Sequence, residues 1–267
     1  MLRLMTWNLW WRFGPWEQRQ AGIAQLIEQV APDILGLQEV WVEQDGANQA
    51  EILAERLGGY HVAHGELRYR DGLAFTNAIL SRWPFERVEE IPLPRADGTD
   101  SFRRAIATSI RAPFGTVPMF TTHLTYQPDH SAERVAQVAT LAQSIDRLCP
   151  DPEGQFPALL TGDFNAVPDS DEIRTLTGRS AVHVPNLLFN DVWDISGDGS
   201  PGHTWCSSNP HLVDSFWPRR RLDYLFVRWP RTKPIGNPVA AHLAGHEPIG
   251  GVFPSDHYAV WADLRTP

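Results

Sequence analysis

The sequence predicts an α/β protein in which two β-sheets pack face to face, with helices on the outside. Three features indicate this fold. Short apolar runs typical of strands recur along the 267 residues, two strand–helix–strand segments begin at residue 1 and near residue 117, and no low-complexity linker interrupts the chain. We therefore expect one domain over residues 1–267, since a chain of this length can form a single large domain.

The first strand–helix–strand segment covers the N-terminal part of the chain. Residues 2–9 form an apolar run that predicts a strand buried on both faces. Residues 17–30 carry apolar side chains at helical spacing, and Ala31-Pro32 ends the helix. Residues 34–40 predict a second buried strand, so the two strands should lie parallel, as a helical crossover requires.

The later elements follow from the same patterns. We expect helices at 47–57 and 131–148, a short helix near 170–177, and a helical turn near 191–194. Proline and glycine separate the remaining apolar runs, which predict strands at 60–65, 73–81, 86–91, 104–111, 117–125, 157–163, 222–228, 238–243 and 257–264. The total is about ten strands and three or four helices.

Composition limits the class of protein. Hydrophobic residues make up 42% and charged residues 21%, which is typical of a globular domain. The net charge of −9 argues against a protein that coats duplex DNA, but allows an enzyme with a local basic cleft. Cys149 and Cys206 are expected to be buried thiols. We see neither a signal peptide nor a membrane-spanning apolar run, so we expect a cytoplasmic monomer.

Acids, amides and histidines stand where the predicted strands end, and this feature indicates function. Strand ends give catalytic groups a rigid base beside an open surface. A single strand-end Asn is commonly a turn former, and a single His in a strand is commonly a core residue. Together the residues predict one shared site: Asn8, Glu39, His123, Asp163, Asn165, Asp223, Asp256 and His257.

Six short motifs carry these residues, and they resemble the endonuclease/exonuclease/phosphatase superfamily of metal-dependent phosphoesterases. They are Thr6-Trp7-Asn8, Leu37-Gln38-Glu39, Thr122-His123-Leu124, Gly162-Asp163-Phe164-Asn165, Arg221-Leu222-Asp223-Tyr224 and Ser255-Asp256-His257. Each motif alone is weakly specific, whereas the ordered set is highly specific. The resemblance implies a four-layer α/β/β/α sandwich with two mixed sheets, which agrees with the strand and helix pattern.

Phosphodiester hydrolysis suits these side chains. The substrate is anionic, so the reaction needs charge neutralisation, an activated water and a stabilised leaving oxygen. Mg²⁺ or Mn²⁺ supplies neutralisation through hard oxygen ligands and keeps several waters. We expect Glu39 to be a direct metal ligand, and Asn8 and Asp256 to coordinate directly or through water. No thiolate or histidine-pair spacing indicates zinc.

The resemblance also implies catalytic roles. Asp163 would orient or deprotonate the attacking water, and Asn165 would stabilise the pentavalent phosphorus. His257 would contact a non-bridging oxygen while Asp223 holds it in a charged form. His123 would assist the leaving oxygen or the phosphate. Abasic-site endonucleases carry tyrosine at that position and pancreatic-type deoxyribonucleases carry histidine; the carboxylate that orients His123 stays open.

Several arginines and aromatic residues are candidates for substrate binding. Arg103 and Arg104 either face the phosphate or begin a solvated strand. Trp11 belongs to an aromatic loop that either stacks on the substrate or packs over the core. The run Arg219–Arg221 either binds a polyanion or lies in a surface loop, and Arg134 is expected on the surface.

These observations predict a divalent-metal-dependent phosphodiesterase, most simply a nuclease. The alternative is a phosphatase or phosphodiesterase that acts on inositol phosphates or sphingomyelin-like head groups, because the chain is acidic and its loop aromatic. A non-catalytic binding module of the same fold is a third hypothesis. It is disfavoured because none of the eight polar residues is missing.

Overall fold

Two mixed β-sheets pack face to face in the computed structural model, which describes residues 1–150, 155–214 and 217–267. The seven-stranded sheet has the order β12 (Pro238–Ala244), β13 (Ala259–Leu264), β1 (Leu2–Asn8), β2 (Ile34–Glu43), β5 (Leu73–Ser81), β3 (His61–His64), with β4 (Tyr69–Arg70) also paired to β5. The six-stranded sheet has the order β10 (Leu188–Asp191), β11 (Asp223–Trp229), β9 (Leu159–Asp163), β8 (Gly115–His123), β7 (Asp100–Ala112), β6 (Phe85–Pro94).

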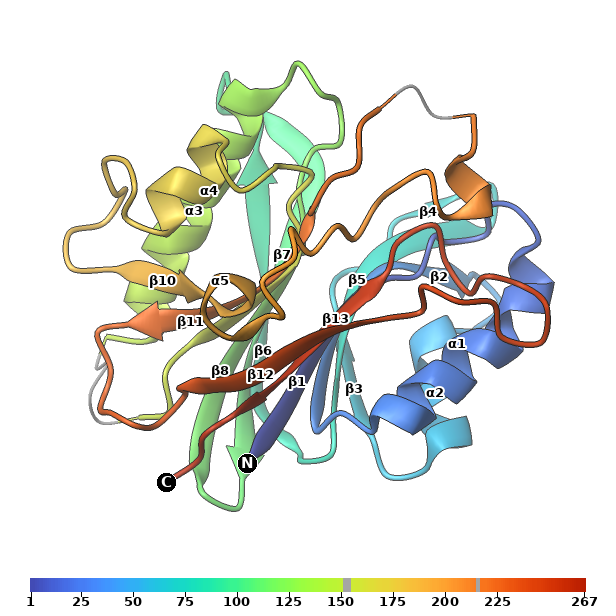
Figure 1. The fold of residues 1–267 in the computed structure, drawn as a ribbon, viewed down its shortest axis with the longest axis horizontal. Helices are drawn as coiled ribbons and strands as arrows, with labels where there is room; N and C mark the ends of the chain where they lie inside the picture. Colours follow the sequence, from blue (N-terminus) through green and yellow to red (C-terminus); the bar gives the residue numbers. More distant parts are fainter. Residues whose placement is uncertain (151–154, 215–216) are drawn as a thin grey trace.

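Helices cover the outer face of each sheet (Figure 1). The helices α1 (Trp16–Val30) and α2 (Gln49–Leu57) lie against the seven-stranded sheet, and α3 (Ser131–Leu148) and α4 (Asp171–Leu176) against the six-stranded sheet. The short helix α5 (Val192–Ser196) follows β10, and a 3-10 turn spans Pro210–Leu212. The predicted four-layer sandwich is therefore confirmed.

Alternating side chains of the strands supply the apolar layers between these elements. In β1, Leu2 and Leu4 pack into the cluster between the sheets, whereas Met5 and Trp7 pack into the cluster beneath α1 and α2. This alternation is the two-residue period of a strand that is buried on both faces. A third cluster, which includes Phe120 of β8, lies beneath α3 and α4.

Both predicted crossover segments are present. The strand β1 pairs in parallel with β2, and β8 pairs in parallel with β9. The sequence pattern missed β4 and β10, because runs of two and four residues are too short to show a period. Cys149 and Cys206 are buried free thiols, as expected. Within the described ranges, no helix combines the length and the apolar character that a membrane span requires.

The two sheets approach each other closely where β2 faces β8 and β9. A Cβ atom on Gly36 would lie 2.3 Å from Thr161 Oγ1 and 2.6 Å from Thr121 Oγ1, so only glycine fits. Gln38 Nε2 donates to Thr121 Oγ1 at 2.9 Å across the same seam. We call these four residues, Gly36, Gln38, Thr121 and Thr161, the polar seam. It joins β2 of one sheet to β8 and β9 of the other.

Candidate active site

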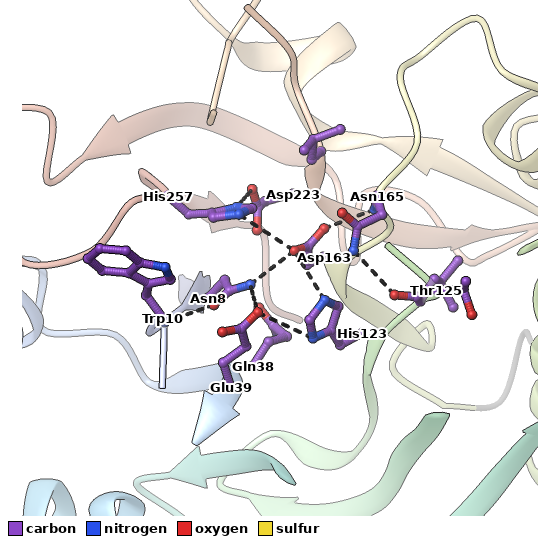
Figure 2. Close-up of polar contacts among 12 residues, drawn as sticks. Asn8, Trp10, Gln38, Glu39, His123, Thr125, Asp163, Asn165, Asp223 and His257 are labelled. Atoms are coloured by element: carbon purple, nitrogen blue, oxygen red, sulfur yellow. Dashed lines mark hydrogen bonds and ion pairs between the residues drawn. The ribbon is translucent and has the colours of Figure 1, made fainter. Parts of the chain in front are cut away.

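The eight polar residues predicted to form the site come together at one end of the two sheets. Figure 2 shows Asn8, Glu39, His123, Asp163, Asn165, Asp223 and His257 close to one another. Asn8, His123 and Asp163 end the strands β1, β8 and β9, while Asp223 begins the antiparallel strand β11. The start of an antiparallel strand lies at the same edge as the ends of its neighbours. A cleft of about 550 Å³ opens there, and Glu39, His123, Asp163, Asn165, Asp256 and His257 line it.

Glu39 lies inside a strand rather than at its end, so that part of the sequence prediction is wrong. The strand β2 continues to Glu43, and its pairing with β5 changes register between Leu37 and Val40. Glu39 has a φ of +57° at this irregularity. The left-handed conformation costs a non-glycine residue about 1–2 kcal/mol, and such strain gathers at functional sites.

Asn8 links carboxylates that come from different sheets. Its Nδ2 donates to Glu39 Oε1 at 3.1 Å and to Asp163 Oδ2 at 3.0 Å, while its Oδ1 accepts the Trp10 backbone N–H at 2.9 Å. Figure 2 shows the side chain between the two acids. Asn8 thereby fixes the separation between Glu39 and Asp163, and its role as a metal ligand stays a prediction.

Glu39 and Asp256 concentrate negative charge in the cleft. Burial, repulsion from Asp256 and the nearby Asp163 raise the pKa of Glu39 to about 7, although the Asn8 amide opposes the change. Burial also raises the pKa of Asp256, against the attraction of His257 and Arg19. Two carboxyl groups that resist ionisation beside each other indicate a place where a cation would be stabilised.

The residues that line this cleft fit a divalent metal ion. Glu39 Oε2 is buried and has no hydrogen-bond partner among the described residues, and a carboxylate oxygen is a hard donor of the kind that Mg²⁺ prefers. Ligand atoms of Asp163, Asp223 and His257 also lie within 4.8 Å of one another. We favour Glu39 as the ligand, because the proximity of Asp223 and His257 is explained by a hydrogen bond between them.

His257 and Asp223 form a buried pair across the two sheets. His257 Nδ1 lies 2.8 Å from Asp223 Oδ2, and Thr204 Oγ1 accepts the Asp223 backbone N–H at 3.3 Å. Burial opposes a charged imidazole, but the carboxylates of Asp223, Asp163 and Asp256 together raise the pKa of His257 well above its usual value. The pairing predicted from the resemblance is thus present, with His257 Nε2 3.8 Å from Asp163 Oδ2.

Asp163 stays ionised although it is buried. Burial would raise its pKa, but His257, His123, the Asn8 amide and the Asn165 backbone N–H outweigh burial and lower it. The Asn165 N–H donates to Asp163 Oδ1 at 2.9 Å, and the Asn165 side chain donates to the Leu124 carbonyl at 3.2 Å. Asp163 is therefore an anionic acceptor that can orient a water molecule.

His123 is held as a neutral imidazole. Burial and the nearby Arg103 lower the pKa of His123 to about 3. Its Nε2 lies 3.5 Å from Asp163 Oδ2 and its Nδ1 lies 4.0 Å from Glu39 Oε1. Within the part of the chain that the structure describes, Nδ1 is buried without a hydrogen-bond partner. Asp163 is thus the nearer carboxylate, at a distance longer than a good hydrogen bond.

The structure separates the three predicted substrate-binding residues. Arg103 lines the cleft, faces Glu39 and Asp163, and forms no ion pair within the described part of the chain. Arg104 instead pairs with Glu90 and Asp100 and lines a neighbouring cavity. Trp11 lines that neighbouring cavity too, where its Nε1 donates to the Ala74 carbonyl at 3.2 Å.

Sequence reasoning missed several residues that shape the site. Trp10, rather than Trp11, lines the cleft. Arg19 is fully buried and donates to the carbonyls of Leu9, Trp10, Trp11, Phe13 and Pro254, which fixes the aromatic loop. Arg134, expected on the surface, is buried and pairs with Glu172. The helical pattern of the sequence did not indicate that Arg19 would be buried, because its hydrogen-bond partners are carbonyl groups of loops outside the helix.

The chain belongs to the Endonuclease/Exonuclease/phosphatase family, whose model matches residues 5–257. Tyrosyl-DNA phosphodiesterase 2 of Gallus gallus is 27% identical over 263 residues, which are 96% of this chain and 65% of that protein. The chain therefore spans about two thirds of the length of this relative.

Solved structures share the fold. An endonuclease/exonuclease/phosphatase from Beutenbergia cavernae superposes with a TM-score of 0.76 at 26% identity, over 99% of this chain and 71% of that one. D. rerio TDP2 complexed with single strand DNA product has a TM-score of 0.76 at 20% identity, over 99% of both chains. At this identity the second likeness concerns the fold alone.

Proposed function

We propose that this chain acts as one domain and is a divalent-metal-dependent phosphodiesterase that hydrolyses a nucleic acid strand. One observation carries the proposal: Asn8, Glu39, Asp163 and the His257–Asp223 pair converge in one cleft, where Glu39 Oε2 is buried and none of the described residues forms a hydrogen bond with it. The family match and the names of the relatives support the same chemistry.

In this proposal each side chain has a distinct task. Glu39 would hold a Mg²⁺ or Mn²⁺ ion, with help from Asn8 and Asp256, and a bound ion would supply neutralisation of the phosphate charge. Asp163 accepts a proton from the attacking water or orients it, since its low pKa keeps it anionic. The cationic His257 donates from Nε2 to a non-bridging oxygen, and Asp223 maintains that charge. Neutral His123 donates a hydrogen bond to the phosphate or to the leaving oxygen.

The lining of the cleft supports an extended, base-bearing substrate. Trp10, Phe13, Phe75, Tyr126 and Trp205 surround the charged groups. Aromatic side chains beside a phosphate site stack on unpaired bases, at about 1–3 kcal/mol per base. Arg103, which forms no ion pair with any described residue, adds a cation that can bind the scissile phosphate.

A substrate panel tests the proposal. Single- and double-stranded DNA, RNA, an inositol phosphate, sphingomyelin and bis(p-nitrophenyl) phosphate are incubated with Mg²⁺, Mn²⁺ or a chelator. We expect metal-dependent cleavage of the single-stranded oligonucleotides. Glu39→Gln should lower the rate about a thousandfold or more, whereas Glu28→Gln, at an exposed site on α1, should not. Cleavage that survives the chelator, or full activity in Glu39→Gln, contradicts the proposal; cleavage of sphingomyelin alone supports the lipid alternative.

A further inference from the structure

Another cavity, distinct from the one that Arg104 and Trp11 line, adjoins the catalytic cleft, and we call it the second cavity. It has a volume of about 630 Å³, and four residues line both spaces: Pro128, Asn165, Trp217 and Arg220. The catalytic residues account for the chemistry of one phosphate and leave this second cavity without a task.

Arg220 stands at the junction of the two cavities. Its guanidinium carbon lies 4.8 Å from the ring centre of Trp205 and 5.0 Å from that of Trp217, so both indoles hold it. Reciprocal backbone hydrogen bonds with Trp205, at 2.8 and 3.0 Å, fix the backbone of Arg220. A guanidinium that is held by ring faces keeps the N–H groups in its plane available to an anion.

The neighbours of Arg220 in the sequence are used differently. Arg221 is buried and pairs with Asp191 and Asp194, which excludes it from substrate binding. Arg219 is exposed at the rim of the second cavity. Among the described residues, Arg220 forms no ion pair, and its Nε is buried without a hydrogen-bond partner. A half-buried arginine without a carboxylate partner calls for an anionic ligand.

Other charges in the second cavity do not satisfy Arg220. Glu172 is paired with Arg134 at 2.8 Å, and Asp169 is exposed. The attraction that Arg220 experiences comes from Asp163, on the catalytic side of the junction. The cationic group therefore borders the catalytic cleft at its junction with the second cavity.

We propose that Arg220 binds the phosphodiester next to the scissile one, and that the second cavity holds the nucleotide that connects these two phosphates. This inference rests on the proposed function and adds a subsite that selects chain substrates over isolated diesters. A planar guanidinium makes paired hydrogen bonds to a phosphate, which a lysine cannot reproduce.

The test compares a single-stranded thymidine oligonucleotide with bis(p-nitrophenyl) phosphate, which has only one phosphate. Arg220→Gln should lower kcat/KM for the oligonucleotide about tenfold or more, and leave the isolated diester within about twofold. The logarithmic salt dependence for the oligonucleotide should become shallower by about 0.7, the loss of one contact to a single strand. Arg56→Gln, which removes the same charge from an exposed site on α2, should change neither substrate.

An oligonucleotide with an uncharged methylphosphonate beside the cleavage site, placed on each side in turn, locates the contact. On one of these two substrates, the wild type and Arg220→Gln should have equal values of kcat/KM. Arg220→Lys should keep the salt dependence but recover only part of the rate, which also provides a variant if Arg220→Gln folds poorly. If Arg220→Gln lowers kcat/KM equally for the oligonucleotide and the isolated diester, or for neither, the proposed subsite is refuted. Absence of metal-dependent cleavage by the wild type overturns the proposed function instead.

Discussion

Replacing Glu39 with glutamine should stabilise the metal-free protein while it abolishes activity. Folding raises the pKa of Glu39 from 4.5 to about 7, mainly through burial and repulsion from Asp256. The folded state therefore binds this proton more tightly than the unfolded state. The stability that the protonated group provides is complete below about pH 4.5 and is lost as the pH rises to about 7.

The size of the effect follows from that change in pKa. Each pH unit between the two values corresponds to about 1.4 kcal/mol, so ionised Glu39 destabilises the metal-free fold by up to about 3 kcal/mol. Glutamine carries no charge, and its Oε1 can still accept from Asn8 Nδ2 as Glu39 does. The left-handed backbone at this position is unchanged, so its strain cancels in the comparison.

Urea unfolding in a chelator measures the difference. At about pH 8 the free energy of unfolding of Glu39→Gln should exceed that of wild type by up to about 3 kcal/mol, and the two should converge near about pH 5. Added Mg²⁺ should then raise the stability of wild type but not of the variant. A variant that is equal to or less stable than wild type at the higher pH would refute the reasoning, since burial would then not oppose the charge.

Two further predictions concern residues that support the site. Asp223→Asn removes the largest charge that raises the pKa of His257, so the pKa should fall and the alkaline limb of the pH–rate profile should move to lower pH; an unmoved limb would exclude His257 as the titrating acid. Arg19→Met leaves the loop carbonyls without their buried donor and should lower the free energy of unfolding by about 3 kcal/mol or more. Urea unfolding measures that loss, and a change below about 1 kcal/mol would show that water replaces the guanidinium.

The fold could be predicted because its signals are local. The buried strands at residues 2–9 and 34–40 and the helix between them carry clear periods, and helical crossovers have a defined geometry. The site could be predicted because carboxylates and amides recur at strand ends. The bulge that turns Glu39 into the cleft was not predictable, since it depends on pairing with a strand some forty residues away.

The use of the arginines could not be predicted either. Arg219, Arg220 and Arg221 are adjacent in the sequence, yet they are respectively exposed, stacked at the cleft, and buried in ion pairs. What separates them is the identity of their partners, which come from elements elsewhere in the chain. Composition and spacing carry no information about that choice.

The polar seam means that catalytic alignment is a property of the contact between two layers. Glu39 belongs to one sheet and His257 to the loop that leads into β13 of that sheet, whereas Asp163 and Asp223 belong to the other sheet. A slight slide of one sheet over the other would change the distance between Glu39 and Asp163 without unfolding either sheet. Substitutions at Thr121, which does not line the cleft, should therefore change turnover, and a laboratory search for altered rates should include this position alongside the cleft.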